Sequence, residues 1–598
     1  MRDASKIASI NNKDLILIQP NRLMRRKRQW IGLPLLSLCF LLIIPGCSTQ
    51  YAYWNSPKPA IISPPFPDVT SATRHASFKI ADDRGNQDVL VLLALSGGGS
   101  RAAYFAARVM TTLQHDSDLD ILKEVDVISS VSGGSLAGAY YAVTEDPEFV
   151  IPVPRCRLDC EVFTGQSKIA CQKTGKKQQL VIGKLTAEEK KAAQKDLRKA
   201  ISGCSAKEWS YIERLFNLSQ TKVSSNRIWI SRDEWDERTK KGLLNLNLRF
   251  RRAHVEDLMS RDYVGRWVQN WFLPTNIVRY WFTAYDRTDI MAQTLEDNLF
   301  DTKNLGVPLK FGDLNPERPY LILNATDGTE AYKPQMQELK TKSQKMHFGS
   351  VITFTDEDFT EHLNSDIYQL HVARGVMASA AFPAVFSYVT LKDFTDENDE
   401  RYHHVFDGGN ADNLGLRSLS RVIKSNPDRY KHIIVILVDA FVEPPGKSSK
   451  NPEPRSSFSH ILDMNFMDSF DALLKSNRQI GINEFLKDNI DIQDKLTFWH
   501  ITFDKVDENT IDITPLSYDD NPLELKTLRE GLNHIETNLH ISDNDKARIE
   551  EAVRIIFRKD GPCLERIKKI LLSENTDRSG LVQKRDACLL RPDLEKKF

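Results

Sequence analysis

Two consecutive segments of this chain share one plan, a strand of buried type followed by a small-residue turn and a helix. Residues 88–96, DVLVLLALS, form a continuous apolar run of strand length, as in a parallel sheet with helices on both faces. The turn GGG and the helical pattern SRAAYFAARVMTTLQ follow. Residues 125–132, VDVISSVS, then GGS and LAGAYYAV, repeat the plan. Two such units in succession predict a layered α/β fold.

Further strand candidates extend this fold over much of the chain. They lie at residues 320–326, 403–409, 432–440 and 496–504. We therefore expect one α/β domain, composed of residues 84–150 and 300–510, followed by a C-terminal helical segment at 511–598.

The stretch 151–299 differs from the rest of the chain. It carries four cysteines, a Lys/Glu/Ala-rich helical pattern and six of the nine tryptophans, without a strong buried strand. We interpret it as a mainly helical insertion that covers the site as a lid or cap. Its tryptophans indicate either a small core of its own or a surface that contacts a membrane, because tryptophan favours places with one apolar and one wet side.

The N-terminal region resembles an export leader. The basic segment RLMRRKRQ precedes the apolar run 30–46 and Cys47, and the sequence IIPGCS resembles a bacterial lipobox. Residues 1–47 are thus predicted to be a signal or lipoprotein leader, with Cys47 lipidated, and the Pro- and Ser-rich residues 48–83 a tether. This predicts a lipid-anchored protein of the bacterial cell envelope, at the outer membrane or periplasmic face. An uncleaved N-terminal anchor is the alternative.

Charge and cysteine content narrow the possible partners. The chain has 81 Lys and Arg residues and 81 Asp and Glu residues, so it has no excess positive charge that would attract nucleic acid. The cysteines after the leader are even in number, which in an exported chain predicts disulfides. A disulfide between Cys563 and Cys588 would close a local loop. The four cysteines of residues 151–299 could instead bind zinc, although their spacing lacks the two C-x-x-C pairs that are typical of zinc sites. These six are Cys156, Cys160, Cys171, Cys204, Cys563 and Cys588.

A serine nucleophile is predicted at the second strand–turn–helix unit. Ser132 stands where the strand gives way to the helix, in a pattern close to G-x-S-x-G. Gly134 matches the second glycine, and Ser130 stands in place of the first. Such a turn pushes a serine hydroxyl out of the sheet edge, where it can attack a substrate.

The first glycine turn and a later aspartate supply the remaining chemistry. Gly97, Gly98 and Gly99 precede a helix, where backbone N–H groups can stabilise a carbonyl oxygen that becomes negative. A phosphate loop is excluded, because neither G-x-x-x-x-G-K-[ST] nor G-x-G-x-x-G occurs here. Asp407 ends an apolar strand just before Gly408 and Gly409, and an aspartate there can accept a proton. Arg101 either orients the loop or binds an anionic head group, or is an ion-pair partner on the helix surface.

Together these segments resemble the patatin-like phospholipase family, which includes the catalytic domain of cytosolic phospholipases A2. The resemblance is carried, in order, by GGGSR, SVSGGS, RGVMASAAFPAVF at residues 374–386, and DGG followed by Asp412 and Asn413. It implies a three-layer αβα sandwich and a Ser/Asp dyad, in which Ser132 attacks the ester and Asp407 is the base. The glycines at 97–99 would line the oxyanion hole.

The same resemblance implies that neither a histidine, a metal nor a cofactor is needed. His403 and His404 are accordingly expected to be strand residues. The expected activity is that of an exported serine acyl hydrolase acting on lipid esters, most of all phospholipids, at a membrane surface. Two alternatives stay open: an esterase or thioesterase acting on another acyl substrate, and a non-catalytic envelope lipoprotein that binds lipid or protein through the same fold.

Overall fold

The computed structural model of the protein describes the α/β region, parts of the stretch 151–299 and the C-terminal helices. The leader, Cys47 and most of the tether lie outside the described residues, so lipidation stays a prediction. None of the described helices is both long and apolar enough to cross a bilayer. The described residues are 52–58, 88–115, 120–144, 250–302, 307–315, 318–329, 349–383, 385–396, 398, 400–425, 429–443, 465–512, 527–535, 540–572 and 588, with short pieces within 157–230.

An eight-stranded mixed sheet forms the centre of the molecule. Its order is β12–β13–β9–β3–β2–β14–β15, with β10 paired to β9. The strands from β9 to β15 in this order run parallel, and β10, β12 and β13 are antiparallel to their neighbours. The strands are β2 (Val89–Leu95), β3 (Val127–Val131), β9 (Tyr320–Asp327), β10 (Val351–Phe354), β12 (Val389–Asp393), β13 (Arg401–Asp407), β14 (His432–Asp439) and β15 (Leu496–Thr502).

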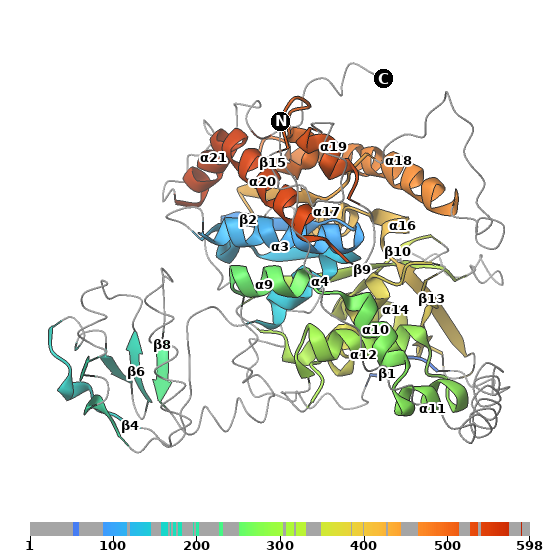
Figure 1. The fold of residues 1–598 in the computed structure, drawn as a ribbon, viewed down its shortest axis with the longest axis horizontal. Coiled ribbons are helices and arrows are strands. Elements are labelled where there is room, and N and C mark those ends of the chain that lie inside the picture. Colours follow the sequence, from blue (N-terminus) through green and yellow to red (C-terminus); the bar gives the residue numbers. More distant parts are fainter. Residues whose placement is uncertain are drawn as a thin grey trace, which may run out of the picture.

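Helices cover both faces of the sheet and explain the continuous apolar run of β2. Leu93 and Leu95 belong to the larger core, whereas Leu90 and Leu92 pack into a second core on the other face. The predicted αβα sandwich is thereby confirmed (Figure 1). The larger core takes α3 (Gly99–His115), α4 (Gly133–Val143), α15 (Val372–Ser379), α20 (Asp543–Lys559) and α21 (Gly561–Leu572), and the second takes α17 (Leu416–Ser425) and α18 (Asn465–Asp488).

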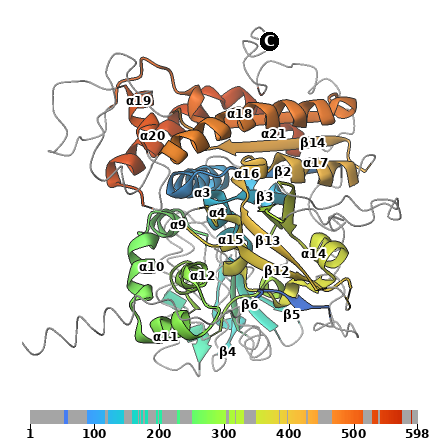
Figure 2. The ribbon, with the colours of Figure 1, turned by 90° about the vertical axis from the view of Figure 1, so that its right-hand side faces the viewer.

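The helices of the 151–299 stretch join the larger core. Val255 of α9 (Arg252–Met259) and Leu295 of α12 (Arg287–Asn298) are buried in it. Between them in the chain come α10 (Tyr263–Trp271) and α11 (Pro274–Phe282). In both orthogonal views, α10, α11 and α12 lie at the end of the molecule opposite α18 (Figures 1 and 2).

The described pieces of 157–230 are mostly short strands, which lack the apolar runs that would mark them in the sequence. One small sheet pairs β4 (Arg157–Leu158) with β7 (Ile201–Ser202). A second has the order β5–β6–β8. Its strands are β5 (Cys171–Thr174), β6 (Lys177–Val181) and β8 (Arg227–Ile230).

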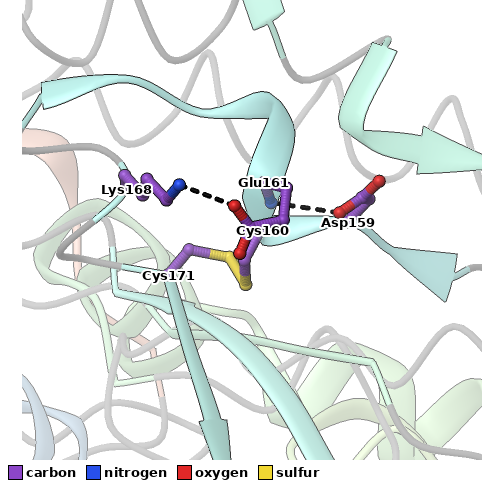
Figure 3. Close-up of a disulfide and its surroundings, with 5 residues drawn as sticks. All are labelled: Asp159, Cys160, Glu161, Lys168 and Cys171. Atoms are coloured by element: carbon purple, nitrogen blue, oxygen red, sulfur yellow. Dashed lines mark hydrogen bonds and ion pairs between the residues drawn. A yellow bond between two sulfur atoms is a disulfide. The ribbon is translucent and has the colours of Figure 1, made fainter.

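Two of the predicted disulfides are present. Cys563 pairs with Cys588, as expected, and Cys160 pairs with Cys171. Figure 3 shows the latter beside the ion pair between Lys168 and Glu161, whose charged atoms lie 2.6 Å apart. Because disulfide sulfurs are not thiolates, these cysteines are unavailable to zinc. Cys156 and Cys204 lie outside the described residues.

A short piece near the N-terminus docks on the body. Strand β1 (Ser56–Pro57) pairs with β11 (Ser365–Asp366). Just before it, the Trp54 indole N–H donates to Asp289 of α12 at 3.0 Å. Asn55 is buried and donates to the Ser365 hydroxyl. The other α-helices that the structure describes are α14 (Asp356–Leu363), α16 (Gly409–Asp412) and α19 (Leu528–Asn533).

Candidate active site

Ser132, the glycine loop and Asp407 meet at one edge of the sheet. Ser132 directly follows β3, and the glycine loop follows the neighbouring parallel strand β2, so both lie at the carboxyl ends of strands. Asp407 ends β13. The Ser132 hydroxyl donates to Oδ2 of Asp407 at 2.8 Å, across 275 residues of sequence. The two residues predicted to form a dyad are therefore in direct contact.

Ser132 occupies a sharp, strained turn. Its φ of 48° and ψ of −120° place a non-glycine residue in a sparsely populated conformation, which costs on the order of 1–3 kcal/mol. The Ser132 N–H donates to Oγ of Ser379 at 3.1 Å, and the Ser135 N–H donates to the Ser132 carbonyl at 2.9 Å. These two bonds hold the turn so that the hydroxyl points at Asp407.

The glycines that flank the turn allow the first and second units to pack closely. A Cβ on Gly133 would lie 2.0 Å from the Gly99 carbonyl oxygen. One on Gly134 would lie 2.6 Å from the Ser96 carbonyl oxygen. Neither position tolerates a side chain, so the paired glycines after Ser132 serve the approach of the glycine loop.

The three amides of the glycine loop are not equivalent. The Gly97 N–H donates to the Asn413 carbonyl at 3.0 Å, so it is already bonded within the fold. Gly98 and Gly99 have φ of 134° and 60°, and their N–H groups donate to none of the residues that the structure describes. They lie at the N-terminus of α3, where the helix dipole favours negative charge. Of the three predicted donors, Gly98 and Gly99 are therefore the available ones.

Asp407 is buried yet held by two donors. The Gly409 N–H donates to Oδ1 at 2.8 Å, and Ser132 donates to Oδ2. Burial raises the pKa of Asp407 to about 6, and the two hydrogen bonds act in the opposite direction by stabilising the carboxylate. Gly408 allows this turn to approach β9, because a Cβ there would lie 2.3 Å from the Asn324 carbonyl oxygen.

Asn324 and Ser379 hold the turn through hydrogen bonds, and neither residue was predicted from the sequence. The Asn324 amide donates to the Ser129 hydroxyl and to the Ser130 carbonyl, both at 2.9 Å. The Ser379 hydroxyl donates to the Asn324 carbonyl at 2.6 Å. A signal was available for each: Asn324 interrupts the apolar run YLILNAT, and Ser379 lies inside the segment 374–386.

Ser130, which departs from the G-x-S-x-G pattern, fits without disturbing the turn. It is fully buried in β3, and its hydroxyl donates to the Ile322 carbonyl at 3.3 Å. Opposite it stands Gly138 of α4, where a Cβ would lie 3.2 Å from the Ser130 hydroxyl oxygen. The space that glycine leaves in the helix accommodates the serine in the strand.

Other residues singled out from the sequence contribute to the fold around the site. Arg101 is buried, and its guanidinium donates to the carbonyls of Ala440 and Ile535. His403 bonds to Asp327 at 2.9 Å, and His404 contacts Thr390 across the β12–β13 pair.

Asp412 and Asn413 frame the loop after Asp407. The Asp412 carboxylate accepts the backbone N–H groups of Leu414, Gly415 and Arg417, which fixes the entry into α17. Within the described part of the chain, no three His, Cys, Asp or Glu side chains are grouped so as to hold a metal ion.

The chain is similar to one protein family and to several solved structures. The family model described as patatin-like phospholipase matches residues 93–151 and 211–420. None of the curated proteins matches the chain. Among solved structures, human GIVD cytosolic phospholipase A2 matches with 10% identity and a TM-score of 0.35, over 84% of this chain and 63% of its own length. VipD from Legionella pneumophila matches with 11% identity and a TM-score of 0.21, over 78% and 67%.

Proposed function

Because the α/β domain of this chain belongs to the patatin-like phospholipase family, we propose that the protein hydrolyses carboxylic esters of lipids, with phospholipids as its substrates. The observation that carries the proposal is the 2.8 Å hydrogen bond from the Ser132 hydroxyl to Asp407. It joins a serine on a strained turn to a buried carboxylate, beside the amides of Gly98 and Gly99, which donate to none of the described residues. Those are the nucleophile, base and charge-stabilising donors that acyl transfer needs.

In the acylation step, Asp407 takes the proton from the Ser132 hydroxyl while the serine oxygen attacks the ester carbonyl carbon. The carbonyl oxygen becomes negative and accepts hydrogen bonds from Gly98 and Gly99. The tetrahedral intermediate then breaks its bond to the leaving alcohol, and the protonated Asp407 returns the proton to that oxygen. The fatty acyl group stays on Ser132 as an ester.

Deacylation follows the same path with water as the nucleophile. Asp407 accepts a proton from the water, whose oxygen attacks the acyl carbonyl. Gly98 and Gly99 again stabilise the negative oxygen, and Asp407 returns the proton to the Ser132 oxygen as the fatty acid leaves. The raised pKa of Asp407 suits it to both roles, because a base that titrates near neutrality also donates its proton readily.

Labelling with a fluorophosphonate probe tests the nucleophile. The wild-type protein should be labelled, whereas Ser132→Ala should not be, and Asp407→Asn should react about 10²–10⁴-fold more slowly because the serine loses its base. Ser420→Ala is the matched control: this serine of α17 is buried and accepts a hydrogen bond from Asn489, outside the network that holds the Ser132 turn, so labelling should persist.

Two results would contradict the proposal. Folded wild-type protein that is not labelled would favour the non-catalytic binding module, and labelling that survives in Ser132→Ala would mean another nucleophile. Mass spectrometry of lipids incubated with the labelling-competent enzyme then identifies the substrate. Release of free fatty acid and lysophospholipid is expected, and release from only neutral esters or thioesters would refute the phospholipid assignment.

A further inference from the structure

An exposed apolar surface is built from α10, α11 and the turn between them. It consists of side chains that are between 41% and 71% exposed, although apolar residues of this size are usually buried. We call it the α10–α11 surface, and its members are Val268, Phe272, Leu273, Val278 and Phe282. We propose that this surface lies in the interfacial layer of an anionic lipid bilayer and brings the active site to its substrate. The proposal extends the function proposed above.

The outward orientation is enforced by polar contacts on the opposite side of the two helices. Asn276 of α11 is almost fully buried and donates to Gln293 of α12 at 3.0 Å. The Tyr285 hydroxyl donates to the same Gln293 at 2.6 Å. The Trp267 indole of α10 donates to the Arg287 carbonyl at 3.0 Å. Rotating the two helices so that the apolar side chains point inward would break these hydrogen bonds. The fold therefore keeps the apolar side chains exposed.

Aromatic side chains at the edge of the surface match the boundary between lipid and water. The Trp271 and Tyr280 rings pack at a tilt of 43° with centroids 5.2 Å apart, and the Trp281 ring packs edge-on against Tyr280 with centroids 6.0 Å apart. All three are only partly buried. Tryptophan and tyrosine concentrate at membrane interfaces, because their rings are apolar and their N–H or O–H groups need a polar partner.

The charge of this segment selects an anionic lipid surface over a protein partner of mixed charge. Residues 263–285 contain no Asp or Glu, although acidic residues number 81 in the whole chain of 598. The segment contains two arginines, Arg266 and Arg279, and both are exposed. Basic residues next to an apolar surface are attracted to anionic head groups and strengthen interfacial binding.

The N-terminal part of the chain approaches the body of the protein near the α10–α11 surface. Trp54 is fixed to Asp289, in the first turn of α12, only seven residues after the last residue of α11. Cys47, the predicted lipidation site, lies seven residues before Trp54 in the sequence, and seven residues span at most about 25 Å. A bilayer that holds a lipid on Cys47 would therefore lie within that distance of Trp54, at the α10–α11 end of the molecule.

The surface also connects to the active site through packed side chains. Trp267 of α10 contacts Phe386 with ring centroids 5.4 Å apart. Phe386 lies in the segment that contains Ala381, whose carbonyl accepts the Asp407 N–H at 3.1 Å. A lipid surface seated on α10 and α11 would thus lie beside the segment that holds the base.

The rate ratio between vesicles and a soluble ester tests the surface in the full-length protein. Phe272→Asp combined with Phe282→Asp should lower the ratio of vesicle phospholipid hydrolysis to monomeric short-chain ester hydrolysis by at least about tenfold, because two large apolar side chains lose their burial in lipid. The vesicles contain phosphatidylcholine and phosphatidylglycerol. The matched control is Ile490→Asp with Leu572→Asp, two residues that are 59% and 64% exposed. This control should leave the ratio unchanged, and an equal fall in it would overturn the proposal.

A binding measurement separates failure of this inference from failure of the proposed function. In the Ser132→Ala protein, phospholipids brominated on their acyl chains should quench tryptophan fluorescence, and the variant that also carries Trp271→Phe and Trp281→Phe should lose much of that quenching. This outcome supports the surface even if the protein proves not to be a hydrolase. Unchanged quenching, or a shift from dimer to monomer in Phe272→Asp/Phe282→Asp without loss of quenching, would refute it and favour a second copy of the chain as the occupant.

Discussion

The active-site edge and the α10–α11 surface depart from the usual distribution of residues in opposite directions. At the edge, Ser129, Asn324, Ser379 and Asp407 are polar and buried, and each is hydrogen-bonded. On the surface, Phe272 and other large apolar side chains are exposed. Buried polar groups and exposed apolar groups both cost free energy, so a fold keeps them where they serve function. The edge positions atoms for chemistry, and the surface offers area for binding.

This contrast predicts that variants at the edge lower hydrolysis of every ester, whereas variants on the surface lower only hydrolysis at a bilayer. The sharpest test at the edge is Gly98→Ala. An alanine at φ of 134° would be strained, and relief of that strain would turn one amide away from the negative oxygen. The value of kcat should fall about 10²–10³-fold on vesicles and on soluble ester alike.

Gly349→Ala is the matched control for backbone strain. Its φ is 81°, and a Cβ there would meet no atom within 4 Å, so it adds strain without touching the site. It should leave kcat unchanged while lowering the melting temperature. A Gly98→Ala enzyme with normal kcat on the soluble ester would contradict the assignment of this amide and weaken the contrast.

The pH dependence of hydrolysis should come from the active-site edge and not from the α10–α11 surface. Asp407 acts as a base only when ionised, and burial raises its pKa to about 6, so kcat/KM should rise with pH through an apparent midpoint near 6. Below the midpoint the rate should fall about tenfold per pH unit. Vesicle and soluble-ester hydrolysis should share this midpoint, because residues 263–285 carry no carboxylate. Asp289 of α12, whose pKa burial also raises to about 6, lies outside that segment and bonds to Trp54.

His403, four residues before Asp407 in the sequence, provides the control for the pH profile. His403→Asn should keep the midpoint, since the His403 ring bonds to Asp327. A midpoint that disappears in His403→Asn would assign the titration to that histidine. Steady-state kinetics across the pH range would decide between the two.

The smallest expected effect concerns the arginines of the surface. Arg266→Gln and Arg279→Gln should each weaken hydrolysis of vesicles rich in phosphatidylglycerol by about fivefold, because a basic residue near an anionic membrane contributes about 1 kcal/mol. Pure phosphatidylcholine vesicles and the soluble ester should show no loss. Arg558→Gln on α20 provides an exposed control. An equal loss in this control would indicate a general effect of net charge.

Much of the fold could be predicted from the sequence, because its information is local. The apolar run of β2 followed by glycines marks a strand, a turn and the start of a helix within about twenty residues. The small strands β5 and β6 escaped prediction for the same reason: KQQLV has neither an apolar run nor strict alternation. The sequence did not indicate how the four cysteines of residues 151–299 pair. The structure shows that Cys160 pairs with Cys171.

The sequence by itself determined where the nucleophile, the base and the donor loop stand along the chain, because each ends a strand with a recognisable turn. Only the tertiary structure decided which hydrogen bonds hold these residues and which amides of the glycine loop are available to a substrate. The bond from the Ser132 N–H to Ser379 joins residues 247 apart, and Gly97 gives its amide to Asn413. The exposure of Phe282 depends on buried contacts of Asn276 on the other side of its helix. Periodicity reports which residues are apolar, whereas packing between distant segments decides which face meets solvent.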